Sequence, residues 1–172
     1  MTFVETVLVG IATSLVASTV FVCLFFRLKP AIEISPYIAR EDIDGETFFI
    51  FKIVNRSKRA IIDVRVEASL ATQTNVEGGP IYRTHQIAFR KSYMFQMGGF
   101  NLADHGADYA CRFATRENLD SMWNNDSDIV RFRVIATDHF SGFSQAFLKE
   151  FRTRRNCIVD GSHKWGADLG VS

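Results

Sequence analysis

The sequence is short of cysteine, proline and net charge, and each shortage excludes a class of protein. Three of its 172 residues are cysteine and three are proline. A small secreted domain held together by disulfides uses more cysteine, and a disordered Pro-rich tail uses more proline. The formal net charge is +1. We therefore expect no nucleic-acid polymer as a partner, because the chain lacks bulk electrostatic attraction to one.

Charge is also absent from a long apolar stretch near the start of the chain, Thr6 to Phe26. As an α-helix its 21 residues would extend about 31 Å, enough to cross the hydrocarbon core of a bilayer. A cleaved signal peptide is the alternative. However, no Lys or Arg precedes the stretch, and its end, Leu24 to Arg27, lacks the small residues of a cleavage site. Residues 1–29 are therefore predicted to be a retained transmembrane anchor with its flank, followed by one domain over residues 30–172.

The basic residues of the chain predict its orientation and its contacts with lipid. Arg27 and Lys29 directly follow the apolar stretch and no base precedes it, so the positive-inside rule places the C-terminal domain on the cytoplasmic side of a cell membrane. Bases at a bilayer surface also attract anionic headgroups. Arg152, Arg154 and Arg155 form a second basic cluster. We expect these five residues to bind membrane lipid or a small anionic ligand, although an ordinary charged strand end is the alternative for the second cluster.

Small residues recur at every fourth position of the apolar stretch. Gly10, Ser14 and Ser18 would lie along one face of the helix, and such a stripe lets two helix backbones approach closely. This pattern predicts a homo-oligomer that packs through the stripe. The alternative is a helix that faces lipid all round.

Strand patterns dominate the remaining sequence. Glu46 to Val54 is apolar on both faces and should be a central strand. Ile61 to Leu70 alternates, with Ile62, Val64, Val66, Ala68 and Leu70 facing inward, and we expect it to pair with its predecessor in a hairpin. Asp128 to Thr137 alternates in the same way. Three weaker strands are expected at Ala31–Ile34, which Pro36 should end, Ile81–Phe89 and Ser92–Met97.

Three further segments complete the predicted secondary structure. Asn75 to Pro80 is predicted to be a loop, and Thr115 is predicted to cap a short helix in which Leu119, Met122 and Trp123 share one face. Phe143 to Phe151 is ambiguous, because its phenylalanines at every fourth position suit a helix. The preceding turn favours a strand that pairs back on Asp128–Thr137. Together these elements predict an all-β immunoglobulin-like β-sandwich with one short helix, preceded by a single transmembrane helix.

The order of these elements resembles the cytoplasmic domain of inward-rectifier potassium channels, which is itself an immunoglobulin-like sandwich. The resemblance is carried by the Phe-rich segment and basic turn of Phe48–Leu70, the Glu-Gly loop of Val76–Ile81, the short helix and following strands of Glu117–Phe147, and Trp165–Gly166. The family's pore needs two spans and a Thr-Val-Gly-Tyr-Gly filter, and this sequence has one such span and no such filter. The chain therefore cannot form that potassium pore alone, and the resemblance implies a membrane-proximal sandwich that packs against copies of itself and senses a ligand or lipid.

No catalytic constellation is recognisable, so we predict neither an enzyme nor a cofactor. The segment from Asp104 to Asp108, with Cys111, gathers possible metal ligands, but the spacing matches no standard zinc site and a polar surface loop is expected instead. Asp138 and His139 are interpreted as a solvated turn. Cys111 and Cys157 are either reduced thiols or one disulfide.

Two functions remain as hypotheses. The first is a single-pass membrane protein whose cytoplasmic sandwich is a non-catalytic sensing and assembly module. The second is a membrane-disrupting effector gated by a small ligand such as a nucleotide signal.

Overall fold

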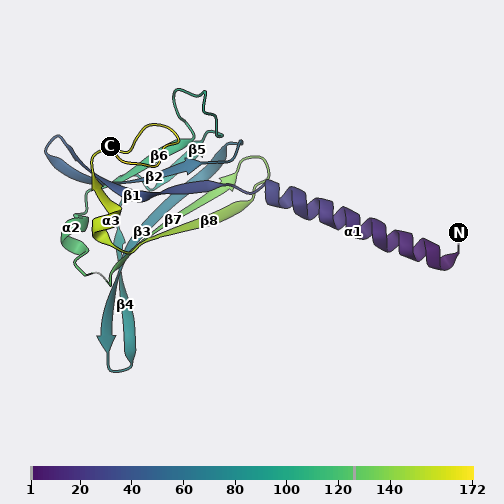
Figure 1. Cartoon of the computed structure of the whole chain (residues 1–172), viewed down its shortest axis with the longest axis horizontal. Helices are drawn as coiled ribbons and strands as arrows, with labels where there is room; N and C mark the ends of the chain where they lie inside the picture. Colours follow the sequence, from purple (N-terminus) through teal and green to yellow (C-terminus); the bar gives the residue numbers. More distant parts are fainter. Residues whose placement is uncertain (1, 126) are drawn as a thin grey trace.

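The structure is a computed structural model that describes residues 2–125 and 127–172. Along these residues the helices and strands follow the order α1 (Phe3–Arg27), β1 (Ile32–Ile43), β2 (Glu46–Asn55), β3 (Ile61–Val76), β4 (Gly79–Ile87), β5 (Tyr93–Met97), β6 (Ala110–Thr115), α2 (Leu119–Met122), β7 (Ile129–Asp138), β8 (Ser144–Phe151), α3 (Arg154–Cys157) and β9 (Ile158–Asp160). The strands form a domain from which α1 projects at one end (Figure 1).

The predicted N-terminal helix is confirmed. Thr2 caps α1: its hydroxyl accepts the backbone N–H of Glu5, and the Glu5 carboxylate accepts the N–H of Thr2 at 2.7 Å. Such a capping box satisfies N–H groups that a helix start leaves unpaired. Segment Phe3–Phe25 is long and apolar enough to cross a membrane, and its most apolar part is exposed. Thr13 and Thr19 bond their hydroxyls to backbone carbonyls one turn earlier, both at 2.8 Å, so these polar groups are satisfied within the helix.

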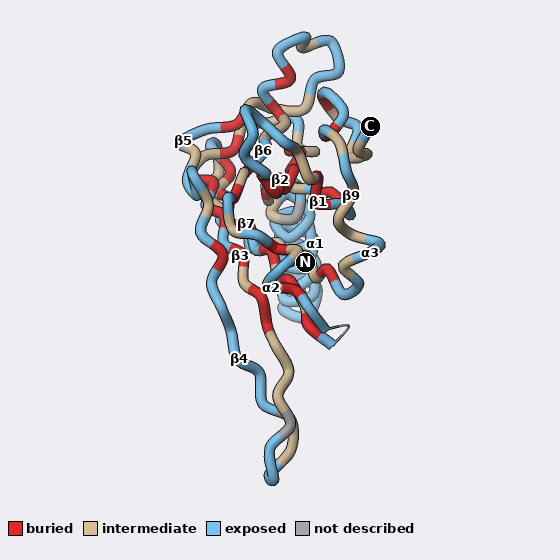
Figure 2. The backbone as a smooth tube through the Cα atoms, turned by 90° about the vertical axis from the view of Figure 1, so that its left-hand side faces the viewer, coloured by how far each residue is buried: buried red, intermediate tan, exposed pale blue. Residues whose placement is uncertain are grey.

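The predicted all-β sandwich is also confirmed. One sheet has the strand order β6-β2-β1-β9, and the other has the order β4-β3-β7-β8, with β5 also paired to β3. Buried residues concentrate on these strands, whereas α1 is exposed from Phe3 to Leu24 (Figure 2). α2 packs Leu119 and Trp123 into the core as predicted. α3 is a second short helix that the sequence analysis did not predict.

Phenylalanine fills the space between the sheets. Phe51 of β2 stacks on Phe132 of β7 with ring centroids 4.8 Å apart. Phe89 and Phe151 meet the same Phe51 ring edge-on, at 5.4 and 5.8 Å. Aromatic rings prefer these offset and edge-to-face arrangements. The predicted central place of β2 is confirmed, because β2 lies between β6 and β1 and is buried from Phe48 to its end.

The predicted hairpin between β2 and β3 is wrong, because the two strands belong to different sheets. The chain crosses from one sheet to the other over residues 56–60. The buried Asn55 side chain shapes this crossing: its amide nitrogen donates to the carbonyls of Arg59 and Gly98, both at 2.8 Å, and its oxygen accepts the N–H of Ser57. A Cβ atom at Gly99 would lie 2.3 Å from the Lys58 carbonyl oxygen. The backbone therefore passes the crossing too closely for any side chain at that position.

Two register irregularities contradict details of the strand predictions. Pro36 does not end β1, since the pairing with β2 breaks between Ile34 and Ile38 and then resumes. The proline, which has no N–H to donate, lies within this irregularity. In β3 the pairing shifts between Ile62 and Arg65, around Asp63 with its φ of 51°. The shift reverses the alternation, so Ile61 is buried and Ile62 is only half-buried.

Two predicted boundaries are also wrong. Asn75–Pro80 is mostly strand, because β3 continues to Val76 and β4 begins at Gly79, so the two form a long hairpin arm that projects from the sandwich (Figure 1). Thr115 does not cap α2. It ends β6 and donates its hydroxyl to the Ala88 carbonyl at 2.6 Å, whereas Asn118 is the cap. The ambiguous segment after Ser141 is strand β8, paired with β7 as predicted.

Candidate functional site

The first candidate site is the junction where α1 meets the domain. The rings of Phe25 and Phe143 lie 4.3 Å apart between centroids. The last turn of a helix leaves carbonyl oxygens without partners in the helix. Here two domain side chains bind such groups, because Arg59 donates to the Arg27 carbonyl at 2.8 Å and Ser141 donates to the Leu28 carbonyl at 2.9 Å. The end of α1 is thus attached to the sandwich by both packing and hydrogen bonds.

Asp138 organises the domain side of this junction. Its side chain is fully buried and pairs with the Arg59 guanidinium at 2.8 Å. Its other oxygen accepts the N–H of Phe140 at 3.1 Å and both the N–H and the hydroxyl of Ser141, at 2.8 and 3.0 Å. Burial acts to raise the pKa of Asp138, but the hydrogen bonds from Ser141 and Arg59 outweigh it and hold this pKa below its ordinary value. The carboxylate therefore stays charged and fixes the turn that follows β7.

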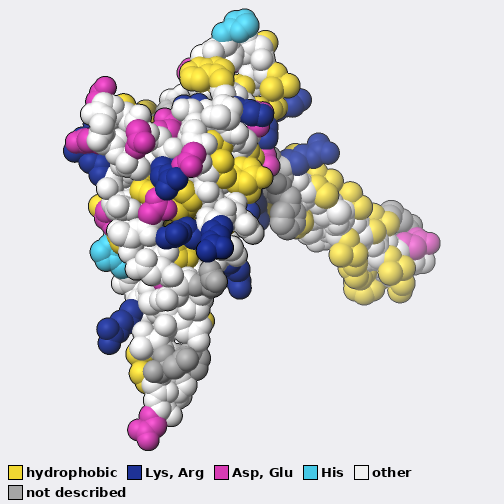
Figure 3. All heavy atoms as spheres, turned by 60° about the vertical axis from the view of Figure 1, so that its left-hand side comes forward, with side chains coloured by type: hydrophobic (Ala, Val, Ile, Leu, Met, Phe, Trp, Pro, Cys, Tyr) yellow, Lys and Arg dark blue, Asp and Glu magenta, His cyan; other side chains and the backbone are white. Residues whose placement is uncertain are grey.

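The predicted lipid-binding residues lie in two separate places. Arg27 and Lys29 lie at the junction, where the Lys29 ammonium is 4.9 Å from the centre of the Phe25 ring. Figure 3 shows Lys and Arg side chains where the apolar surface of α1 joins the domain. The other cluster lies beyond the end of β8 that is remote from α1 (Figure 1). The structure therefore does not bring the two groups together.

Two arginines of the remote cluster have partners within the domain. Arg152 pairs with Glu150 at 2.7 Å. Arg154 donates to the carbonyl oxygens of Asp120 and Trp123, at 2.6 and 3.3 Å. Arg155 is exposed. Of the three, Arg154 serves to hold α2 against α3, and the sequence pattern did not indicate that role.

The small-residue stripe is exposed on α1. Gly10, Ser14 and Ser18 are exposed, and a Cβ atom added at Gly10 would have no atom of the described residues within 4 Å. The stripe is therefore available to a second helix or to lipid.

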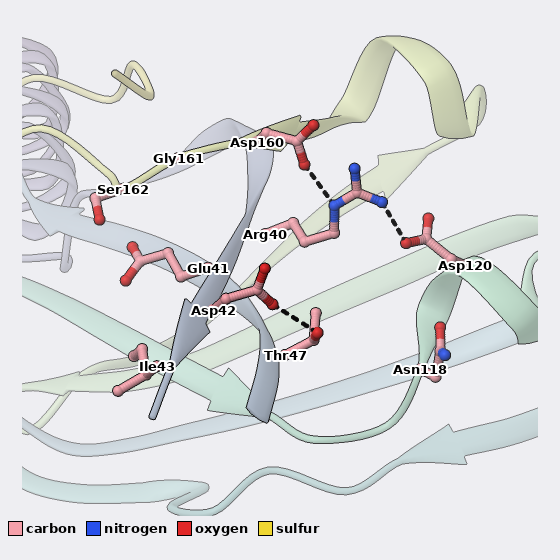
Figure 4. A pocket seen from close by; sticks show the side chains of 10 residues that line it. All are labelled: Arg40, Glu41, Asp42, Ile43, Thr47, Asn118, Asp120, Asp160, Gly161 and Ser162. Carbon is pink, nitrogen blue, oxygen red and sulfur yellow. Dashed lines mark hydrogen bonds and ion pairs between the residues drawn. The ribbon is translucent and has the colours of Figure 1, made fainter. Parts of the chain in front are cut away.

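A polar pocket of about 810 Å³ is the second candidate site. It lies where β1, β9 and the start of α2 converge, and Figure 4 shows the side chains that line it. Arg40 stands at its centre between two carboxylates: it donates to Asp120 at 2.6 Å and also pairs with Asp160. Asp42 accepts the hydroxyl of Thr47 at 2.6 Å. The hydrogen bonds that Arg40 donates to the two carboxylates, that of Asp160 foremost, raise the pKa of Arg40 above its ordinary value.

The charge of this pocket favours cationic groups over anions. Its charged lining consists of four carboxylates, those of Glu41, Asp42, Asp120 and Asp160, and the single guanidinium of Arg40. That guanidinium is already bound by two of them. One oxygen of Glu41 is buried and has no hydrogen-bond partner among the described residues. Local sequence patterns do not predict this pocket, because its lining comes from three distant segments of the chain.

A buried lysine of β2 holds the C-terminal segment, which includes Lys164 and Asp168, by hydrogen bonds. Lys52 of β2 is 1% exposed and donates to the carbonyl oxygens of Lys164 and Asp168, at 2.5 and 2.6 Å. Burial, together with the nearby Arg112, lowers the pKa of Lys52 to about 8. Arg112 also donates to the His163 carbonyl. These bonds explain how an irregular segment is held against the sheet.

The predicted polar loop around Asp104 is closed by its own hydrogen bonds. Asp104 accepts the N–H groups of Gly106 and Asp108, at 3.0 and 2.9 Å. Within residues 2–125 and 127–172, His, Cys, Asp and Glu form no group of three or more that could hold a metal ion. Cys111 and Cys157 are free thiols, so the disulfide that the sequence left open is absent. Burial raises the pKa of Cys111 to about 11, which makes this thiol unreactive.

No family model matches the chain, and no curated protein matches it. The resemblance to inward-rectifier cytoplasmic domains therefore stays a prediction.

Proposed function

We propose that this protein is a single-pass membrane protein whose β-sandwich acts on the cytoplasmic side as a non-catalytic sensing and assembly module. The observation that carries the proposal is the attachment of α1 to the sandwich. Two side chains of the domain bind the last carbonyls of α1, and one ring packs on Phe25. A helix held in this way cannot turn independently of the domain, so a change in how sandwiches associate would be passed to the helices.

The alternative, an effector gated by an anionic nucleotide signal, has less support. The carboxylates of the pocket described above would repel phosphate groups, and its central arginine is bound by Asp120 and Asp160. We therefore propose the assembly function without that ligand.

Self-association through the stripe is the first prediction of this function. We expect Gly10→Leu combined with Ser14→Leu to reduce the crosslinked oligomer by about tenfold in native membranes, because bulky side chains prevent close approach of the backbones. Leu is apolar, so insertion should be unchanged. Crosslinking of the full chain, read by gel mobility, measures the effect.

The matched control is Val9→Leu with Thr13→Leu, which adds bulk on a neighbouring face of α1. This pair should leave the oligomer intact. If the wild-type chain runs as a monomer after crosslinking, assembly is refuted and a simple tether becomes the better description.

Orientation is tested separately. We expect a reporter fused after Ser172 to be active on the cytoplasmic side, because Arg27 and Lys29 follow the span. Replacing both bases by Gln should weaken or mix this orientation. Activity confined to the opposite side of the membrane in the wild-type fusion would contradict the proposal.

A further inference from the structure

The turn between β7 and β8, residues 139–143, exposes a large apolar side chain beside the end of α1. Phe140 is 79% exposed, although it lies in a domain whose other phenylalanines mostly fill the core. A single exposed apolar side chain on a soluble domain needs no explanation. The position of this one, however, sets it apart from Leu148, which is similarly exposed on β8.

Two contacts place the turn at the depth where the apolar part of α1 ends. Ser141 donates to the carbonyl of Leu28, the residue that caps α1. Phe143 packs on Phe25 in the last apolar turn. A bilayer crossed by α1 would end at this level, because the charged residues Arg27 and Lys29 follow at once. Figure 1 shows the β7–β8 turn beside the end of α1.

The turn is held in one shape with Phe140 directed outward. The buried Asp138 carboxylate accepts the N–H groups of Phe140 and Ser141, and the Asp138 carbonyl accepts that of Gly142 at 3.0 Å. The N–H of His139 donates to the Ala60 carbonyl at 3.2 Å. These bonds fix the backbone on both sides of Phe140, so little conformational entropy remains to be lost when its ring binds a surface.

The surroundings of the turn are basic. Arg27 ends α1 and Lys29 follows it, and Lys58 and Arg59 precede Ala60, which bonds to the turn. The carboxylate at the turn is Asp138, which is buried and paired with Arg59. An aromatic side chain flanked by bases is the combination that anionic bilayer surfaces attract, since rings favour the interface and bases bind the headgroups.

We propose that the β7–β8 turn is a second membrane contact, in which Phe140 inserts into the interface of the bilayer that α1 crosses and the neighbouring bases bind anionic headgroups. This inference rests on the proposed function, because it needs α1 to span. It would seat the sandwich on the membrane by its α1 end. The β3–β4 arm and the acidic pocket would then face away from the lipid.

The experiment labels the full chain with an environment-sensitive dye in vesicles of phosphatidylcholine and phosphatidylglycerol. In a background with Cys23, Cys111 and Cys157 replaced by Ser, single cysteines are introduced as Phe140→Cys, Leu148→Cys and Val20→Cys. Lipids with a nitroxide near the headgroup end of the acyl chain quench a dye that enters the interface. Circular dichroism checks that each labelled chain keeps its strand spectrum.

We expect the dye at position 140 to be quenched at least threefold more than the dye at 148, and to lose part of that quenching when phosphatidylglycerol is omitted. The dye at position 20 should be shielded from aqueous iodide in both lipids. Equal quenching at 140 and 148, with position 20 shielded, would overturn the membrane contact and leave the anchor intact. If iodide reaches position 20, α1 does not span, and the anchor and the second contact are both refuted.

Discussion

Val134→Asp is expected to unfold the sandwich. Val134 is 0% exposed and lies in β7 between Val66 of β3 and Phe147 of β8. A carboxylate at this position would have no partner, and burying an unpaired charge costs several kcal/mol, comparable to the ~5–15 kcal/mol that stabilises a typical domain. Circular dichroism of the full chain in detergent should show the strand signal lost or its melting temperature lowered by more than 15 °C.

The control for this substitution is Leu148→Asp on the adjacent strand. Leu148 is 61% exposed and lies opposite Arg133, so the new carboxylate would stay hydrated next to a base. We expect its free energy of unfolding to lie within about 0.5 kcal/mol of the wild-type value. Equal melting temperatures for Val134→Asp and the wild type would mean that β7 does not face the core.

Asp138→Ala is expected to detach the domain from the end of α1. The substitution removes the partner of Arg59 and the acceptor of the Phe140 and Ser141 N–H groups. Removing one member of a buried pair costs about 3–5 kcal/mol, and we expect roughly 2–3 kcal/mol here because Arg59 is partly exposed. Hydrogen exchange should accelerate at residues 139–143, and melting should shift downward. Asp42→Ala, which removes one exposed hydrogen bond to Thr47, serves as the matched control.

Acid should reproduce part of this effect. The pKa of Asp138 is lower in the folded protein than its ordinary value of 3.8, so the folded state binds this proton less readily than the unfolded state. The contribution of Asp138 to stability is therefore complete well above pH 3.8 and declines as the pH falls through and below that value. The Asp138→Ala chain should lose less stability than the wild type over that range. An identical pH profile for both chains would contradict the role assigned to this carboxylate.

The alternation of apolar residues predicted the strands that the core requires. β7 is the clearest case, because Val130, Phe132, Val134 and Ala136 are all buried as expected. The same alternation, extended by one step, places residue 138 on the inward face. The predicted strand ends at Thr137, and the prediction that Asp138 belongs to a solvated turn is wrong, because its side chain is buried. A charged residue at an inward-facing position of a buried strand indicates that it pairs with an opposite charge inside the domain, here Arg59.

Local sequence patterns could not predict two other features, the crossing between the sheets and the pocket around Arg40. Between β2 and β3 the chain passes from one sheet to the other. Asn55 shapes this crossing by donating a hydrogen bond to the carbonyl of Gly98, which lies more than forty residues later in the sequence. The pocket around Arg40 needs Asp120 and Asp160, which are 80 and 120 residues away from Arg40 in the sequence. Hydrophobic periodicity reports which face of a strand is buried, and it contains no information about which distant segment covers that face.

The junction at α1 also sets an order of events during synthesis. Leu28 and Ser141, which share a hydrogen bond there, are 113 residues apart in the chain. At about 5–20 residues per second, roughly 6–23 seconds pass between the synthesis of Leu28 and that of Ser141. If α1 spans a membrane as proposed, the nascent helix would enter the bilayer before Ser141 can bind the Leu28 carbonyl. Ribosome pausing ahead of the β7–β8 turn would then lengthen the time during which two nascent helices can pair before their domains close.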